Sequence, residues 1–284
     1  MTLVAENSPP TRAVRAPLGR LLAAEMRWAL RRPRTLIAIA LLALVPVLIG
    51  VGALVAGNSE RGGPDGLFAA LAGNGFLLPV LALTLLLTML LPLLGAMSAA
   101  DALAGESAHG TLRGLLIAPV GRGRLLAVKA FGVATVVLTG VVAVAVVGLV
   151  TGLFIGGTDG LVTLSGSTVS VGSALARVGL AVSWVAFQVF AVAAVALAVS
   201  ACTDHPLVVM AATLAGALVF GILTVIPQLD WLQPYLLTTG WTSITDVVRD
   251  PIPLDGLVNS TLKATCYLVI GLSLAYARLS TKDG

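Results

Sequence analysis

Few residues in this sequence have the types and the spacing that catalysis or metal binding needs. The chain contains two histidines, His109 and His205, and two cysteines, Cys202 and Cys266. Cys202 and His205 flank Asp204 and could supply part of a metal site. A closed site needs three or four ligands, however, and no further ligand is near in sequence. We therefore interpret this stretch as a tight polar turn and expect no metal site.

Sequence motifs of enzymes are also absent from the chain. It has neither the H-E-x-x-H pattern of zinc proteases nor the G-x-x-x-x-G-K-[ST] loop that binds nucleotide phosphates. A serine protease inside a membrane needs a histidine at membrane depth, and both histidines fall at the predicted membrane edge. We expect no catalytic residue and no cofactor in this chain, so ATP and magnesium, if the protein uses them, would have to be bound by another polypeptide.

The composition predicts the elements that make up the chain. It is 58% hydrophobic and 11% charged, with a mean hydropathy of +1.02, whereas a water-soluble domain needs more polar surface. A helix crosses the hydrocarbon core with about 20 consecutive apolar residues, and apolar side chains on every face do not fit barrel strands. The sequence therefore predicts an all-α membrane protein with one transmembrane domain over residues 1–284 and six transmembrane helices, near 35–56, 73–100, 126–155, 174–200, 206–228 and 259–277.

Lysine and arginine residues predict the orientation of these spans. With both termini in the cytoplasm, thirteen of the seventeen basic residues lie on the cytoplasmic side, as the positive-inside rule requires. The other four are Arg61, Arg177, Arg249 and Lys263, which we place outside or at span ends. We expect a multi-pass protein of the inner (plasma) membrane. Its pI near 9.5 then reflects topology and contact with anionic lipids, and no nucleic-acid partner is inferred.

Residues 18–33 predict an interfacial amphipathic helix, preceded by a flexible cytoplasmic tail at 1–17. Apolar residues share one face of this helix, while Arg27 and Arg31 lie on the basic face that would contact anionic headgroups. Glu25 falls in the middle of the apolar arc. It either stays solvated or pairs with a basic group of the cytoplasmic loops.

A charged, glycine-containing segment, DALAGESAHGTLRGLLIAPVGRGRLLAVK at 101–129, separates spans two and three. Pro92 and the small residues after it are expected to end span two. Glu106 suits the N-terminal end of a short amphipathic helix over 106–116, which Pro119 stops. Its leucines would form an exposed apolar patch, so we expect this helix to dock in a groove of another protein.

This segment resembles the cytoplasmic loop between spans two and three of ABC-type-2 permeases, the membrane subunits of one class of ABC exporters. Members of that family show a similar order of an acidic residue, G-T-L, paired leucines, P-V/L-x-R, L-L and lysine. The N-terminal A-E-M-R-W-A-L-R-R is similar to the family's K-E-x-R entry helix, with Ala24 in place of the lysine. The six-span layout extends the resemblance to nearly the whole chain.

The resemblance implies that the loop forms a coupling helix that rests on a separate ATPase subunit. The coupling contacts that it implies are Glu106, Gly110, Thr111, Leu112, Leu115 and Leu116, with Pro119, Arg122 and Lys129 setting the entry into span three. The complete transporter would contain two ATPase subunits, with ATP and magnesium, and a second permease subunit that is identical or homologous. Family members of this size include drug and antibiotic exporters and the permeases of copper-site assembly systems.

Two alternative functions stay open at this level. A secondary carrier driven by an ion gradient usually has carboxylates inside its spans, and none of the thirteen acidic residues falls inside a predicted span. A scaffold, or a mechanotransmitting subunit that relays ATPase motion without moving a cargo, would form a sealed bundle. We favour the ATP-driven exporter, because the energy for transport has to come from outside the membrane.

The transport path is weakly marked in the sequence. Polar residues inside the spans are expected mainly to hydrogen-bond between helices, and these are Asn74, Thr84, Thr88, Ser183, Gln188 and Thr213. Gly148, Gly152 and Gly156 recur at four-residue spacing. This spacing permits close helix packing, either within one subunit or across a dimer.

The last predicted outer loop, residues 229–256, contains Trp231, Tyr235 and Trp241. Such aromatic side chains gather at the headgroup level of a membrane. We expect two short helices that dip into the outer leaflet, and in the resembled family this region often forms a re-entrant helical pair that caps the outer exit. The alternative is an ordinary surface loop with an aromatic anchor.

Overall fold

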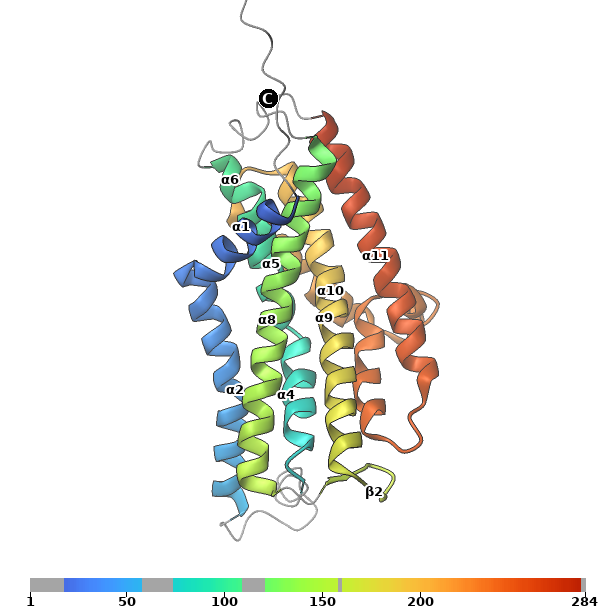
Figure 1. Ribbon diagram of the computed structural model, residues 1–284. Helices are drawn as coiled ribbons and strands as arrows, with labels where there is room; N and C mark the ends of the chain where they lie inside the picture. The colour runs from blue at the N-terminus through green and yellow to red at the C-terminus, as the bar shows by residue number, and fades with distance from the viewer. Residues whose placement is uncertain (1–17, 58–73, 109–120, 158–159, 282–284) are drawn as a thin grey trace, which may run out of the picture.

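The computed structural model describes residues 18–57, 74–108, 121–157 and 160–281. They form a bundle of long helices that run up and down one common direction (Figure 1). The helices are α1 (Leu18–Arg31), α2 (Pro33–Gly57), α4 (Leu77–Leu87), α5 (Leu90–Ala102), α6 (Ala104–Ala108), α8 (Arg122–Gly156), α9 (Val171–Cys202), α10 (Pro206–Leu223) and α11 (Leu254–Thr281). Shorter elements are the strands β1 (Leu161–Val162) and β2 (Thr168–Val169) and the 3₁₀ helices η1 (Pro227–Leu229), η2 (Gln233–Tyr235) and η3 (Thr238–Val248).

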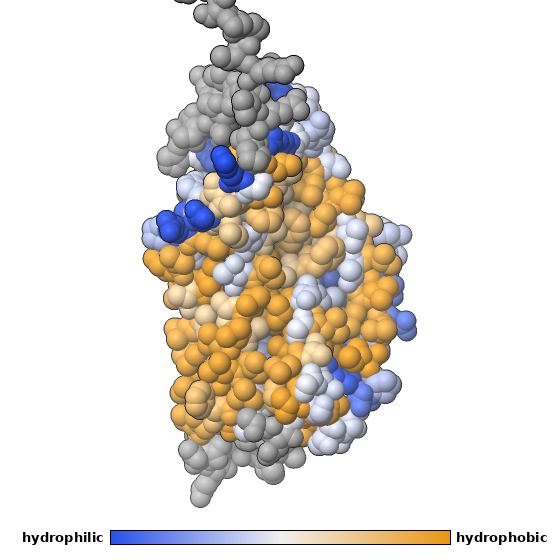
Figure 2. Space-filling model, in the orientation of Figure 1, coloured by the Kyte–Doolittle hydropathy of each residue, from blue (hydrophilic) through white to orange (hydrophobic). Residues whose placement is uncertain are grey.

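Five of the described helices are long and apolar enough to cross a membrane, namely α2, α8, α9, α10 and α11. A sixth span is formed if α4 and the helical segment after it count as one, with a bend of 58° between them. Figure 2 shows an apolar surface over most of the visible side of the bundle, with hydrophilic residues near α1 and along the lower right of the view. The expected all-α membrane fold is therefore confirmed.

The bend between α4 and α5 has a local cause. Proline has no N–H, so Pro92 cannot donate to the carbonyl of Thr88, four residues earlier. Met89, between them, has φ −150° and ψ −48°, outside the helical region. The helix continues through the small residues after Pro92 and α5 ends at Ala102, close to the predicted end of span two at residue 100.

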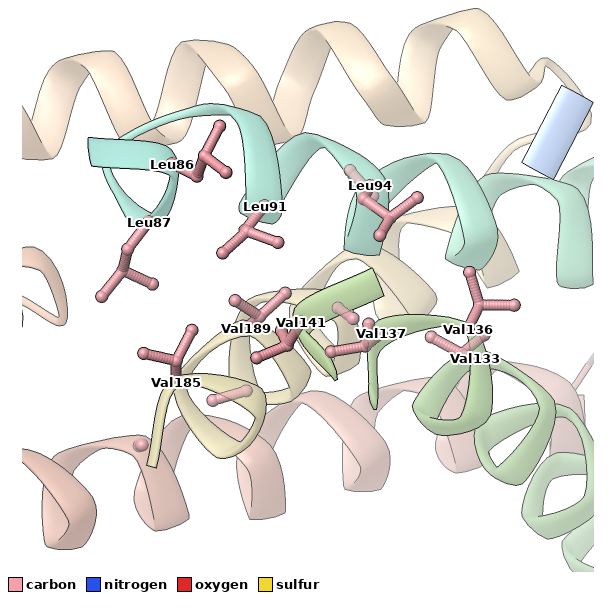
Figure 3. Packing of buried hydrophobic residues seen from close by; sticks show 14 of the residues in the cluster. Leu86, Leu87, Leu91, Leu94, Val133, Val136, Val137, Val141, Val185 and Val189 are labelled. Carbon is pink, nitrogen blue, oxygen red and sulfur yellow. The ribbon is translucent and has the colours of Figure 1, made fainter. Parts of the chain in front are cut away.

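The core lies where α4 and α5 cross α8 and α9. Around this core, α2 packs on α8 and α11 packs on α9, at opposite edges of the bundle (Figure 1). Figure 3 shows leucines of α4 and α5 facing valines of α8 and α9, and the labelled residues are Leu86, Leu87, Leu91, Leu94, Val133, Val136, Val137, Val141, Val185 and Val189. Lipid tails are as apolar as these side chains, so close packing is what stabilises such a core in a membrane.

Glycines allow α8 to approach α4. A Cβ at Gly148 would lie 2.9 Å from the Cα of Pro79, and a Cβ at Gly152 would overlap the backbone carbonyl of Gly75. The glycine spacing was compatible with packing within one subunit or across a dimer. For Gly148 and Gly152, the contacts are made within one subunit.

A short hairpin, which the sequence did not predict, lies at the end of the bundle away from α1 (Figure 1). Its strands are antiparallel, with Leu161 opposite Val169. The backbone N–H of Leu164 donates to the carbonyl of Val248, at 3.0 Å. This hydrogen bond joins the hairpin to the end of η3.

The polar side chains inside the spans do not join helices in the way expected. Four hydroxyls donate to carbonyls three or four residues earlier in the chain, those of Thr84, Thr88, Ser183 and Thr213. Asn74 does make a longer-range bond, from Nδ2 to the carbonyl of Val162 at 2.6 Å. Gln188 is fully buried, and its amide has no hydrogen-bond partner among the described residues.

Candidate coupling site

Three charged side chains from three helices meet at the end of the bundle that carries α1. Lys129 of α8 donates to Glu25 of α1, with Nζ 3.0 Å from Oε1 and 3.2 Å from Oε2. The same ammonium group donates to Oε1 of Glu106 in α6. The exposed fractions of these side chains are 5% for Lys129, 14% for Glu25 and 10% for Glu106. We call these three residues the Lys129 network.

The sequence of α8 leaves room for this network. Gly132, three residues after Lys129, faces α1, and a Cβ there would lie 2.8 Å from Cγ of Glu25. The Lys129 Nζ also lies 5.1 Å from the ring of Trp28. Glu25 is therefore paired, as the second interpretation of its place in the apolar arc predicted, although its partner belongs to α8 and not to a loop.

A second group of charges adjoins the network. Asp101 of α5 binds two arginines, with Oδ2 3.4 Å from Nη1 of Arg32 and Oδ1 3.3 Å from Nη1 of Arg34. The guanidinium carbon of Arg32 lies 3.3 Å from the centre of the Trp28 ring. Burial lowers the pKa of Arg32, and the nearby carboxylates oppose this shift. A guanidinium group stays protonated in proteins even so, and Arg32 keeps its charge.

Helix α6 also contacts the end of α9 and the turn between α9 and α10. The hydroxyl of Ser107 donates to Oδ1 of Asp204, and the backbone N–H of Ala104 donates to Oγ of Ser200, at 2.9 Å. Asp204 is thus a hydrogen-bond acceptor in this turn. Within the described ranges, no group of three or more His, Cys, Asp or Glu side chains is arranged to hold a metal ion.

An open groove of about 900 Å³ runs beside these charges, between α1, the α5–α6 end and α8. Its wall combines apolar residues, among them Leu21, Leu125 and Val128, with the Lys129 network. Through the Lys129 network, this arrangement connects α1, α6 and α8 by ion pairs.

The structure describes part of the predicted coupling segment. Glu106 lies in the Lys129 network, and Nη1 of Arg122 donates to the carbonyls of Leu279, at 3.0 Å, and Ser280, at the last turn of α11. Arg27 and Arg31 are exposed on α1. Other predicted residues lie outside the described ranges and stay predictions, namely the tail at 1–17 and Gly110, Thr111, Leu112, Leu115, Leu116 and Pro119.

Three residues that sequence reasoning did not assign to the site are brought to it by the fold. Asp101 binds two arginines, Ser107 joins α6 to the α9–α10 turn, and Gly132 leaves room for Glu25. In a chain with 11% charged residues, an acid at the end of a span is itself a signal. The role of Gly132 has no such signal, because it depends on where α1 lies.

The aromatic outer segment forms three short 3₁₀ helices, where two short helices were expected. Figure 1 shows it within the length of the bundle, beside α9 and α11. Trp231 and Tyr235 are each 68% exposed, whereas Trp241 is 7% exposed and belongs to the core. The expectation of a headgroup anchor was therefore wrong for Trp241.

Lys263 was expected at the end of a span, but the structure places it further inside α11. It lies nine residues after the first residue of α11, and its Nζ donates to Oγ1 of Thr239, at 2.9 Å. It therefore ties η3 to α11.

A family model described as ABC-2 family transporter protein matches residues 20–239. The matched region contains the whole Lys129 network and five of the candidate spans up to the start of η3. None of the curated proteins compared matches this chain. Because the match covers well over half of the sequence, the chain is a member of the ABC-2 transporter family, whose proteins are membrane transport components.

Proposed function

We propose that this chain is the permease subunit of an ATP-driven exporter, and that two separate ATPase subunits drive it through the segment 106–122. The observation that carries the proposal is the Lys129 network. It joins α6 to α1 and α8. The last residues of α6, 106–108, are the first residues of that segment. A force applied to the segment would therefore reach the membrane helices directly.

The connections of α6 support this route. Through Lys129, a displaced α6 pulls on α8 and α1. Through its hydrogen bonds to Ser200 and Asp204, it pulls on the end of α9 and on the turn after it. Buried charge pairs tolerate only a few discrete arrangements, because an unpaired charge is costly inside the protein. Such a network suits a transition between two states of the bundle, inward-open and outward-open or occluded.

Glu106 has a specific place in this proposal. Its side chain is 10% exposed and faces Lys129, which supports a role in transmitting motion within the permease. The leucines at 112, 115 and 116 remain the proposed anchors on the ATPase, since burial of each stabilises an interface by about 1.5–3 kcal/mol.

The surface of α10 supports assembly with a second permease subunit, identical or homologous. Of the eighteen residues of α10, only Val209 is buried in this protomer. The exposed residues are apolar and include Leu207 and Ile222. Such a face packs against lipid or against another apolar helix, and we propose that it meets the second subunit.

The proposal is tested by purifying the tagged chain from its native membrane in mild detergent. We expect an ATPase with a phosphate-binding loop to co-purify, identified by mass spectrometry and by ATP hydrolysis. Leu115→Ala with Leu116→Ala should reduce its recovery at least tenfold, because two lost anchors approach the strength of a modest interface.

The matched control is Leu36→Ala with Leu41→Ala, two leucines that are 52% and 62% exposed on α2. It makes the same chemical change away from the coupling segment and should leave recovery unchanged. Full recovery of the ATPase with the Leu115/Leu116 double variant would contradict the proposed docking. Transport that follows an ion gradient and persists after ATP depletion would support a secondary carrier instead.

A further inference from the structure

Lys263 is a charged residue in the interior of the last candidate span. Helix α11 carries charged side chains at Asp255 and Arg278, near its two ends, and between them at Lys263. A rise of about 1.5 Å per residue separates Asp255 from Arg278 by about 34 Å, close to the hydrocarbon thickness of about 30 Å. Along the same axis, Lys263 lies about 12 Å from Asp255 and about 22 Å from Arg278. Its charge is therefore inside the membrane.

The ammonium group of Lys263 is held in place by the segment that joins η2 to η3. Its Nζ donates to Oγ1 of Thr239, at 2.9 Å, and to the carbonyl of Leu236, at 3.5 Å. The hydroxyl of Thr239 donates in turn to the carbonyls of Gln233 and Leu236. A lysine in a membrane usually extends its ammonium group toward water. Here the hydrogen bonds fix the charge against η2 and η3 instead.

This ammonium group lacks a counter-charge. Lys129, Arg177 and Arg249 each pair with a carboxylate. Lys263 has no such partner among the described residues, and both of its acceptors are neutral. An ammonium group has three N–H donors, so one remains for another ligand. Charged side chains inside a membrane are normally paired, which indicates a missing anion.

Polar residues lead along α11 to this position. Asp255, Asn259 and Lys263 recur every four residues, so they are neighbours on one side of the helix. Asp255 and Asn259 are exposed, and Lys263 is partly exposed. We call these three residues the polar stripe. The exposed residues beside it are apolar, among them Val258 and Leu262. A polar headgroup can therefore follow α11 inward along the polar stripe.

Exposed aromatic side chains lie at the same depth. Tyr235 directly precedes Leu236, whose carbonyl accepts from Lys263, and it is 68% exposed, as is Trp231. Figure 1 shows this segment within the length of the bundle, beside α9 and α11. Exposed tyrosine and tryptophan side chains gather at the headgroup level of a membrane. On this side of the protein, lipid headgroups can therefore reach Lys263.

We propose that Lys263 binds the phosphate group of an anionic lipid in the half of the membrane away from α1 and α6. The phosphate would supply the missing counter-charge and accept the remaining N–H, and the exposed amide of Asn259 would donate to the same headgroup. A zwitterionic lipid brings its own cation, so it leaves the charge of Lys263 uncompensated. The site uses no residue of α10, the helix that we propose to meet a second subunit. The proposal goes beyond the proposed function, because binding here needs neither an ATPase nor transport.

The experiment uses two photoreactive lipids on the full chain in phosphatidylcholine nanodiscs. Both carry one diazirine in the same acyl chain, close to the glycerol, and they differ only in the headgroup, which is phosphoglycerol in one and phosphocholine in the other. Mass spectrometry then maps the labelling of η2, η3 and the first half of α11. We expect the phosphoglycerol probe to label this region about fivefold more than the phosphocholine probe, the effect of one cation close to anionic headgroups.

Variants of Lys263 test the charge itself. Lys263→Met should reduce labelling by the phosphoglycerol probe to the level of the phosphocholine probe, while labelling by the phosphocholine probe stays the same. Lys263→Arg keeps the charge and should keep the preference. The matched control is Arg249→Met, which removes a cation that already pairs with Asp246, at 3.6 Å. It should leave the preference unchanged.

Equal labelling by the two probes in the unaltered chain would overturn the proposal, and this comparison needs no variant to fold. A preference that survives in Lys263→Met would also overturn it, as would an equal loss in Arg249→Met, because general attraction to cations would then explain the labelling. Competition by inorganic phosphate distinguishes a soluble anion from a lipid. We expect no competition, and displacement of the phosphoglycerol probe would contradict a lipid site. None of these results bears on ATPase association, so the proposed function is tested separately.

Discussion

At the scale of single residues, Lys129 joins two carboxylates that would otherwise be buried without a counter-charge. Its ammonium group is shared between Glu25 and Glu106, and the nearby Arg32 balances the remaining negative charge. Removing one partner from a buried ion pair is much costlier than replacing the whole group by neutral side chains of similar shape. The stability effect and the coupling role of the network can therefore be separated by mutation.

Lys129→Met should lower the free energy of unfolding by about 3–5 kcal/mol, because two carboxylates stay buried without their cation. The neutral variant, Glu25→Gln with Glu106→Gln and Lys129→Met, should recover stability to within about 1 kcal/mol of the unaltered chain. Denaturation in mixed micelles measures both. If the single and the neutral variants are equally unstable, or equally stable, the three charges do not form one network.

At the scale of elements, the glycines of α8 set the distance to its neighbours. Gly152 brings α8 against the backbone before α4, and Gly132 admits Glu25 of α1. Both contacts are made within one subunit. The position of α8 relative to α1 and α4 therefore depends on small residues along its whole length.

Gly152→Ala should destabilise the chain by about 1–3 kcal/mol, because the new methyl group overlaps the carbonyl of Gly75 and forces the backbone to move. Gly179→Ala in α9 is the control, since a Cβ there meets no atom within 4 Å. It should leave stability unchanged or slightly higher, because alanine favours helix more than glycine does. Unfolding in mixed micelles measures both variants, and equal stability of the two would refute close packing of α8 on α4 within the subunit.

The sequence predicted those elements that depend on composition alone. Long apolar runs predicted the spans, and the amphipathic pattern of residues 18–33 predicted α1. It did not predict the bend after α4, the β1–β2 hairpin or the burial of Trp241. The bend and the hairpin are local features, which the length and composition of apolar runs do not reveal. The burial of Trp241 depends on contacts with segments far apart in the chain, which residue types do not specify.

The candidate site was predictable to a similar extent. Glu25 was recognisable as an acid in an apolar arc, and Glu106 as an acid at the start of the coupling segment. Their common partner was not recognisable, because Lys129 is separated from Glu25 by 104 residues and meets it only once α1 packs on α8.

At the scale of the whole molecule, the two ends of the bundle differ. The end with α1 and α6 carries the Lys129 network, Asp101 and its arginines. The opposite end carries the hairpin and, near it, Arg177 bound to Asp250. The distribution of basic residues predicts that the first end faces the cytoplasm.

Single cysteines test this orientation. In a background with Cys202→Ser and Cys266→Ser, Thr168→Cys should react with a membrane-impermeant maleimide applied to intact cells, whereas Ala108→Cys should react only after the membrane is opened. Both positions are exposed in the structure. Labelling of residue 108 from outside would reverse the orientation and remove the ATPase from the coupling segment.

The central claim is that the Lys129 network transmits the nucleotide state of a separate ATPase to the membrane bundle. Hydrogen–deuterium exchange of the purified complex, with and without ATP and vanadate, measures this transmission at the far end. In the unaltered complex, we predict that trapping changes exchange over residues 160–170 and 238–250. In the neutral variant, with the same amount of ATPase bound, these changes should disappear. If the neutral variant responds at the hairpin and η3 as the unaltered complex does, the network does not carry the signal.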